Sequence, residues 1–356
     1  MSLALDITDR PNLTPEQVAL RVRFALLLLL AATALMALST GPSGASLWRA
    51  LVALATGTAV DAQDALVLWD IRLPRLILGG LIGAGLASGG AIMQGIFRNP
   101  LADPGLVGVG AGAALGAVSM IVLGSVVPAG VAALLGQHLV AVAAFLGGWI
   151  VTFLLYRIST RLGRTSVATL LLAGIAISAL AGAVTGILIF ISDDRALRDL
   201  TFWSLGSLAG ASWVKVAVAA PLILLALTAG SFLGRGLNAL ALGEAAAMHM
   251  GVPVERLKRI AILSVAAATG AAVAVAGAIG FVGIVVPHLL RLMSGPDHRH
   301  LLWNSALLGA TLLLLADTIS RSIVAPAELP IGIITAVVGA PVFLWILLRQ
   351  NSVVDL

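Results

Sequence analysis

The sequence has no cysteine, one tyrosine and few charged residues among its 356 residues. Without cysteine, the chain cannot form disulfides, use thiol chemistry or hold a Cys-ligated metal. Charged residues make up 10% of the chain, whereas a soluble domain carries about 25%. Because 60% of the residues are hydrophobic, both a soluble globular protein and a disordered chain are excluded.

The chain instead contains long apolar blocks, with a mean hydropathy of +1.09. The blocks do not alternate with polar residues, as the strands of an outer-membrane barrel would. About 20 apolar residues cross a bilayer as a helix, so we expect an all-α polytopic membrane protein. The 39 glycines favour closely packed helices. Nine spans are predicted near 24–40, 76–97, 105–127, 138–156, 166–191, 213–233, 260–285, 302–325 and 331–348.

A tenth, short element is predicted near 286–294, following Pro287, which gives about ten helices and puts both termini on one side. With the N-terminus inside, basic residues are about twice as frequent in the inner segments as in the outer ones, as the positive-inside rule requires. We therefore expect a cytoplasmic arm over 1–20, one transmembrane domain over 21–350 and a cytoplasmic tail over 351–356. The acids Asp6, Asp9 and Glu16 argue that the first span is a retained anchor and not a secretory signal.

Two stretches that run in opposite directions through the predicted membrane are similar. Without gaps, 83–100 and 270–287 share seven of 18 residues. Such a match can arise by chance between helices rich in glycine and alanine. It also fits an inverted repeat, which is common in transporters.

The chain has no phosphate-binding loop, because neither of its two lysines, Lys215 and Lys258, follows glycine and precedes serine or threonine. Asp317 is the one convincing acid within a span. It could belong to an ion-coupled transporter, or it could simply bond to a neighbouring helix. The scattered basic residues and net charge of +5 do not indicate nucleic-acid binding. We therefore expect the energy source to lie on another polypeptide.

The longest inner loop, 234–259, contains a candidate contact for such a partner. Gly243 can interrupt the chain, Glu244 would begin a short helix through Ala247 and His249, and Gly251 would end it. We call 243–251 the inner knob. Its small residues favour close docking, although an ordinary surface loop would have a similar composition.

Several blocks resemble the FecCD-type permeases, which are membrane subunits of ABC importers for haem, iron-siderophores and cobalamin. The resemblance covers the chain from about Arg72 to Arg349. It rests on the blocks 72–75 (RLPR), 89–94 (GGAIMQ), 99–105 (NPLADPG), 170–174 (LLLAG), 277–283 (GAIGFVG), 286–288 (VPH), 316–317 (AD), 328–332 (ELPIG) and 339–343 (GAPVF), and on the glycines of the inner knob.

The resemblance implies the fold of an ABC type II importer permease in the bacterial inner membrane. It implies a homodimer, two ATPase subunits that bind ATP and magnesium, and a periplasmic binding protein. The permease itself would be no enzyme and hold no cofactor or metal. By the same resemblance, Gly243, Glu244, Ala247, His249 and Gly251 couple to the ATPase.

Further roles are predicted at both ends of the spans. The resemblance implies that Arg72, Arg75 and Arg321 pair with glutamates of the binding protein, although lipid phosphates could also attract them. We expect an inner gate near Thr165, Ser166 and Thr169. The remaining motif residues are expected to be structural: Asn99, Pro100, Asp103, Pro104, Pro287 and Asp317.

The residues indicate the substrate less clearly than they indicate the family. The region 243–259 looks most like haem permeases, so we expect haem, with ferric siderophore or cobalamin as alternatives. Met248, His249 and Met250 could ligate haem iron, but they lie in the inner knob, where a helix face packed on the ATPase explains them better. His298 and His300 are expected at the inner surface, exposed to solvent. An ion-coupled secondary transporter remains the alternative from another class.

Overall fold

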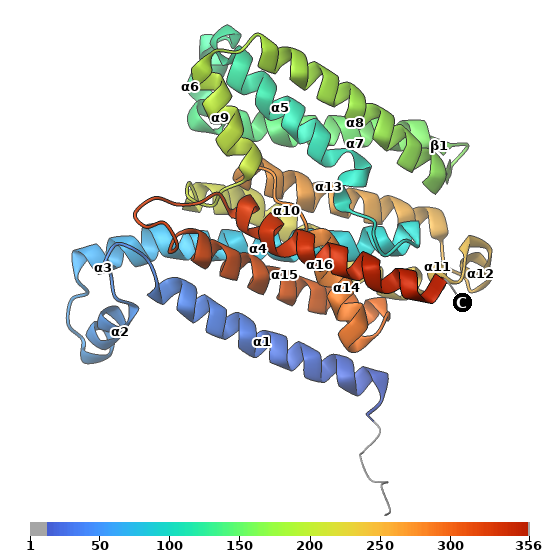
Figure 1. The fold of residues 1–356 in the computed structure, drawn as a ribbon, viewed down its shortest axis with the longest axis horizontal. Helices are drawn as coiled ribbons and strands as arrows, with labels where there is room; N and C mark the ends of the chain where they lie inside the picture. Colours follow the sequence, from blue (N-terminus) through green and yellow to red (C-terminus); the bar gives the residue numbers. More distant parts are fainter. Residues whose placement is uncertain (1–12, 355–356) are drawn as a thin grey trace, which may run out of the picture.

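The computed structural model describes residues 13–354, which are almost entirely helical (Figure 1). A single two-stranded hairpin pairs Thr160 with Thr165 and Arg161 with Arg164. The elements are α1 (Pro15–Ser39), α2 (Leu47–Thr56), α3 (Ala62–Leu66), the π-helix η1 (Val67–Arg72), α4 (Leu73–Phe97), η2 (Pro104–Val107), α5 (Val109–Leu123), η3 (Gly124–Val126), α6 (Ala129–Leu135), η4 (Gly136–His138), α7 (Leu139–Ser159), β1 (Thr160–Arg161), β2 (Arg164–Thr165), α8 (Val167–Phe190), α9 (Asp194–Leu205), α10 (Trp213–Ser231), α11 (Gly234–Ala241), α12 (Glu244–His249), α13 (Val254–Ala276), α14 (Val282–Ser294), α15 (His298–Ser320) and α16 (Ile331–Val354).

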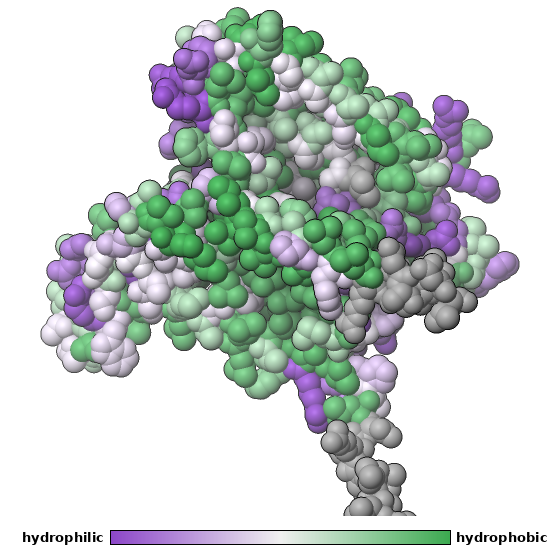
Figure 2. All heavy atoms as spheres, viewed as in Figure 1, coloured by the Kyte–Doolittle hydropathy of each residue, from purple (hydrophilic) through white to green (hydrophobic). Residues whose placement is uncertain are grey.

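Within residues 13–354, nine helices are long and apolar enough to cross a membrane, and α14 is a shorter apolar helix. The prediction of about ten helices is confirmed. The long helices run along a common direction, with α2, α3, α6 and α9 at one end and β1, α11 and α12 at the other (Figure 1). Most purple, hydrophilic spheres lie towards these two ends, and green, hydrophobic spheres dominate between them (Figure 2). This distribution fits a bilayer around the middle of the bundle.

The centre of the bundle is made by α4, α13 and α15, which are the most buried of the long helices. Glycine lets these helices approach at the backbone. A Cβ atom on Gly83 would lie 2.2 Å from the carbonyl oxygen of Gly309 on α15, and one on Gly90 would lie 1.8 Å from that of Gly283 on α14. Since no side chain fits in these spaces, α4 is held directly against both neighbours.

Helix α1 begins earlier than predicted, at Pro15 instead of residue 24. Thr14 and Gln17 form a reciprocal capping box, in which each side chain accepts a hydrogen bond from the other residue's backbone N–H. Part of the predicted arm over 1–20 is therefore helical, as are residues 351–354 of the predicted tail. Asp6, Asp9 and the rest of residues 1–12, and residues 355–356, lie outside the described part of the chain.

The N-terminal half of α1 is bonded to α15. Arg23 Nε donates to Asn304 Oδ1 at 3.3 Å, and Asn304 Nδ2 donates to the carbonyl of Ala19 at 3.2 Å. Asn304 is fully buried, so these bonds form inside the α1–α15 contact, where an unpaired amide would be costly.

The break between the seventh span and the short element was misplaced in the sequence interpretation. The chain leaves helix at Gly277 and re-enters it after Phe281, both of which have positive φ angles, and not at Pro287. Pro287 lies inside α14, where it cannot donate to the carbonyl of Gly283. The side chain of Gln94 donates to that carbonyl instead, at 3.3 Å. This bond explains why the helix continues through the proline.

The two similar stretches differ in local structure. Gly90 lies within the continuous helix α4, whereas the matched Gly277 ends α13 with a φ of +74°. The ungapped alignment thus compares an unbroken helix with a broken one, and the proposed duplication stays a prediction.

Candidate functional site

The inner knob is a short helix, as predicted. Helix α12 runs from Glu244 to His249, and the backbone N–H groups of Gly251 and Val252 donate to the carbonyls of Met248 and Ala247 at 2.9 and 3.0 Å. This pair of bonds is a Schellman motif, which requires the positive φ of +80° found at Gly251. The end of the knob is therefore fixed by its own backbone.

The knob has one buried side and one exposed side. Ala247 is fully buried in the main core, whereas Met248, His249 and Met250 are exposed. The knob lies at the end of the bundle that also carries α11 and the β1 hairpin (Figure 1). An anchored helix with an exposed, partly apolar tip is suited to docking on another protein.

Lys258 joins three segments beneath the knob. Its Nζ atom lies 2.8 Å from Glu244 Oε1 of α12 and 3.3 Å from Glu255 Oε1 of α13, and it donates to the carbonyl of Thr165 at 2.8 Å. The side chain is only 1% exposed. We call Lys258, Glu244, Glu255 and Thr165 the inner cluster. A lysine is almost never fully buried unless it is paired, so these contacts account for its burial.

The predicted gate residues lie next to this cluster. Thr165 is buried and its N–H donates to Glu255 Oε2 at 2.8 Å. Ser166 is exposed and caps α8 by accepting from the N–H of Thr169 at 3.2 Å. The structure therefore brings the predicted gate segment and the predicted coupling helix together, although the role of Thr165, Ser166 and Thr169 as a gate stays a prediction.

A cleft of about 690 Å³ separates the knob from the hairpin. Charged residues of both signs line it, with Glu244 and Glu255 facing Arg164 and Arg256. The mixed charges of this cleft favour a polar protein partner.

The turn after α4 lies at the same end of the bundle as the knob, where Arg98 approaches Gly243. Asn99 Oδ1 accepts from the N–H of Leu101 at 2.9 Å, and Asp103 Oδ1 accepts from that of Gly105 at 2.7 Å. These are the local bonds expected for a turn with Pro100 and Pro104, because prolines leave nearby backbone groups without helical partners. Burial raises the pKa of Asp103. The bonds show a structural use of this motif.

Asp317 has partners that the sequence interpretation did not find. Arg75 Nη2 lies 2.8 Å from Asp317 Oδ1, Arg75 Nη1 lies 2.9 Å from Glu328 Oε1, and Arg321 Nε lies 3.7 Å from Asp317 Oδ2. Arg75, Asp317 and Arg321 are buried, and Glu328 is partly exposed. We call these four residues the outer cluster.

The predicted docking arginines bind their own chain in this structure. Arg72 donates to the carbonyl of Leu38 and lies 3.3 Å from Ser43 Oγ, and Arg321 donates to the carbonyl of Ala37. Cations near a helix C-terminus are favourable, and here they hold the outer end of α1. Docking by Arg72, Arg75 and Arg321 stays a prediction, and in this conformation their side chains are not free at the surface.

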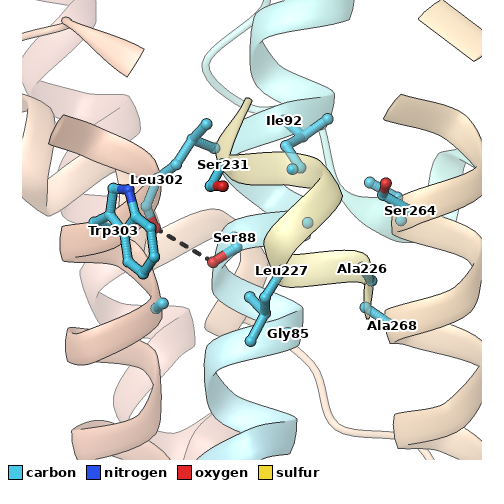
Figure 3. Close-up of a pocket in the computed structure, with 14 residues that line it drawn as sticks. Gly85, Ser88, Ile92, Ala226, Leu227, Ser231, Ser264, Ala268, Leu302 and Trp303 are labelled. Carbon is cyan, nitrogen blue, oxygen red and sulfur yellow. Dashed lines mark hydrogen bonds between the residues drawn. The ribbon is translucent and has the colours of Figure 1, made fainter. Parts of the chain in front are cut away.

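A pocket between α4, α10, α13 and α15 is small, about 50 Å³. Figure 3 shows Ser88, Ser231, Ser264 and Trp303 around it, with Ser88 Oγ donating to the carbonyl of Leu302 at 3.3 Å. Sites for drug-sized ligands span about 300–1,000 Å³. This cavity is therefore too small to be the path of a large substrate.

One expectation about the histidines was wrong. His298 is buried, with its N–H and ring Nδ1 each 2.9 Å from Asn238 Oδ1, and is not exposed to solvent. His300 is partly exposed and lies 3.4 Å from Arg23. The buried position arises because His298 begins α15 directly against Gly95 of α4.

Comparisons with known proteins place this geometry in a family. A model of the FecCD transport family matches residues 26–349. The chain is 49% identical to a hemin transport system permease of Yersinia pestis over 283 residues, which are 80% of this chain and 83% of that protein. It is 45% identical to a cobalamin import permease of Halobacterium salinarum over 316 residues, covering 87% and 82% of the two chains.

A vitamin B12 import permease of Salmonella paratyphi A is 41% identical over 301 residues, covering 83% of this chain and 88% of its own. Among solved structures, a metal-chelate type ABC transporter in an inward-facing conformation matches with a TM-score of 0.81 and 33% identity. The match covers 92% of this chain and 99% of that one. The fold is thus that of an ABC importer permease, and the chain belongs to the FecCD transport family.

Proposed function

We propose that this chain is the membrane subunit that carries haem through an ABC importer, powered by a separate ATPase. The main support for this proposal is the 49% identity to a hemin permease over 80% of the chain. The inner knob supports a contact with this ATPase, because Ala247 anchors α12 in the core while Met248, His249 and Met250 are exposed. In this role Gly243, Glu244, Ala247, His249 and Gly251 form or shape the contact.

Reconstitution tests this proposal. The chain would be placed in liposomes with its candidate ATPase and a binding protein, and ATP turnover would be measured with haem, cobalamin or a ferric siderophore outside. Haem should stimulate turnover and accumulate inside the vesicles. Stimulation by one of the other two compounds, without stimulation by haem, would reject haem as the substrate while keeping the importer.

Cobalamin is the second candidate substrate, because two of the reported relatives at 45% and 41% identity are cobalamin permeases. Their identities lie close to that of the hemin permease. The same reconstitution distinguishes the two, since a cobalamin importer would show no haem-dependent turnover.

The remaining features of the assembly belong to the same proposal. We expect a homodimer with two ATPase subunits below it, in the inner membrane, with both termini cytoplasmic and a periplasmic binding protein above. Few residues of α8 and α16 are buried within one copy, so either lipid or a second copy can cover these helices.

The rival class, an ion-coupled transporter, depends on Asp317. Its pairing with Arg75 and Arg321 supports a structural use of this acid. Uptake by the purified chain alone in liposomes, abolished by Asp317→Asn, would support the rival and contradict the need for an ATPase.

A further inference from the structure

We propose that Lys258 is the positioning residue that transmits movement of α12 to the first turn of α8. The inference rests on the proposed function, because it requires an ATPase that moves the inner knob. It adds a residue inside the membrane subunit that would make the knob and the segment 165–169 move together.

The contacts of Lys258 connect these two segments directly. Its ammonium group lies 2.8 Å from Glu244 in α12 and donates to the carbonyl of Thr165 at 2.8 Å, immediately before α8. Its third partner is Glu255 in α13, at 3.3 Å. A lysine ammonium has three N–H donors, and here three acceptors from three segments surround it. The group therefore holds a specific arrangement of these segments.

Glu255 strengthens the link by holding the same residue of the gate segment. One of its carboxylate oxygens faces Lys258, and the other accepts from the N–H of Thr165 at 2.8 Å. Both backbone polar groups of Thr165 are thus bound by the inner cluster. Since Ser166 caps α8 directly afterwards, a shift of Thr165 must move the start of that helix.

The members of the cluster differ in their exposure to water. Lys258 is 1% exposed, whereas Glu244 and Glu255 are 41% and 33% exposed. The bonds to the buried ammonium are therefore protected from water, while both acids can reorganise at the edge of the 690 Å³ cleft. Coupling between distant sites requires an element of this kind, whose arrangement both sites influence.

A purely structural role for Lys258 predicts lost stability and nothing else. A transmitting role predicts that the knob still moves when Lys258 is changed, but α8 does not follow. Lys258→Met removes the ammonium and keeps most of the side-chain volume. Because Glu244 and Glu255 are partly exposed, this change leaves no deeply buried unpaired carboxylate, and the variant should fold.

The experiment uses the absence of native cysteine to place spin labels. Leu242→Cys reports next to the knob, and Ala168→Cys reports on the first turn of α8; both residues are exposed. In the complete transporter in nanodiscs, each label forms one pair across the homodimer. The distance within each pair is measured without and with a non-hydrolysable ATP analogue, alongside the amount of substrate transported per ATP hydrolysed in liposomes.

In the otherwise unchanged chain, the nucleotide should alter both distances. In Lys258→Met, the change at residue 242 should persist, the change at residue 168 should be lost, and transport per ATP should fall about tenfold, within the usual range of allosteric coupling. Lys258→Arg, which keeps the charge, should restore most of the change at residue 168.

Lys215→Met is the matched control, because it changes the other lysine of the chain, which donates to the carbonyl of Val275 at 3.4 Å near the opposite end of the bundle. It should leave both nucleotide-dependent distance changes intact. If Lys258→Met does not assemble, Glu255→Gln provides the same test, since it weakens the hold on both Lys258 and Thr165.

The outcomes separate this inference from the function on which it rests. If nucleotide changes neither distance in the unchanged chain, the proposed ATPase coupling fails, and the inference fails with it. If both distances change in the unchanged chain and still change fully in Lys258→Met, or in Glu255→Gln where that variant is the one tested, the importer stands and the role of Lys258 is overturned.

Discussion

The inner and outer clusters each bring together charged residues from distant parts of the chain, but they differ in their access to water. In the outer cluster, Arg75 and Asp317 are both buried, and Arg321 is buried beside them. In the inner cluster, only Lys258 and Thr165 are buried, and both acids reach the surface. Buried pairs resist rearrangement, whereas partly exposed ones can exchange partners with water. The comparison indicates that the outer cluster is fixed, whereas the inner cluster can rearrange.

In the outer cluster, Asp317→Ala should cause the largest loss of stability. This change would leave the guanidinium of Arg75 with Glu328 alone and remove the carboxylate that lies 3.7 Å from Arg321 Nε. Removing one partner of a buried ion pair costs about 3–5 kcal/mol. We expect a matching loss of thermal stability in detergent, followed by intrinsic fluorescence. Asp70→Ala, at an exposed residue near the same end, is the control and should melt like the unchanged chain.

The helix contact between the two clusters is tested by Gly90→Ala. The added Cβ would lie 1.8 Å from the carbonyl oxygen of Gly283, so α4 and α14 would have to separate. Overpacking of this kind costs about 1–3 kcal/mol. Gly80→Ala, on the same helix with open space around it, should be neutral or slightly stabilising in the same melting experiment. Equal melting temperatures for both variants would contradict the observed contact.

The inner cluster should tolerate the loss of one acid much better than the outer cluster does. Glu244→Ala leaves Lys258 with Glu255 and the carbonyl of Thr165, and Glu244 is itself 41% exposed. We expect a loss of about 1 kcal/mol or less, measured by the same thermal unfolding. A loss as large as that of Asp317→Ala would remove the distinction between the two clusters.

The smallest expected effect concerns Asp297, which precedes α15 at the inner end. A hydrogen bond from the Arg299 guanidinium lowers the pKa of Asp297 well below its ordinary value. Its contribution to stability is therefore present at neutral pH and is lost as the pH falls below about 4, the ordinary value for aspartate. Because Arg299 is half exposed, the effect should be below about 1 kcal/mol.

Asp297→Asn tests this assignment. It should lower stability at pH 7 slightly and reduce the further loss between pH 5 and pH 3 relative to the unchanged chain. An unchanged acid dependence in the variant would show that other carboxylates dominate that range.

The spans could be predicted because length and hydropathy are local properties of a sequence. The predicted ends of α7, α8, α10 and α16 fall within a few residues of the observed ones, apart from the C-terminal end of α16. The inner knob was also predictable, since Gly243, Glu244 and Gly251 mark helix ends locally. Both clusters were missed as clusters, because Arg75 meets Asp317 and Thr165 meets Lys258 only through the tertiary fold.

The misplaced break at Pro287 has the same cause. Proline usually ends a helix, but a side chain from α4 satisfies the carbonyl that Pro287 leaves free. No pattern within 260–294 reveals that Gln94 is near. The true break needed positive φ angles at Gly277 and Phe281, and phenylalanine gives little indication of such a conformation.

Helix α1 is bonded near both of its ends, by Asn304 of α15 near its N-terminal end and by Arg321, the residue after α15, near its C-terminal end. Two attachment points prevent pivoting about either one. We therefore expect α1 to move together with α15. A fluorophore on an exposed position of α1, for example Phe24, would consequently track the displacement of α15 without any alteration of the central helices.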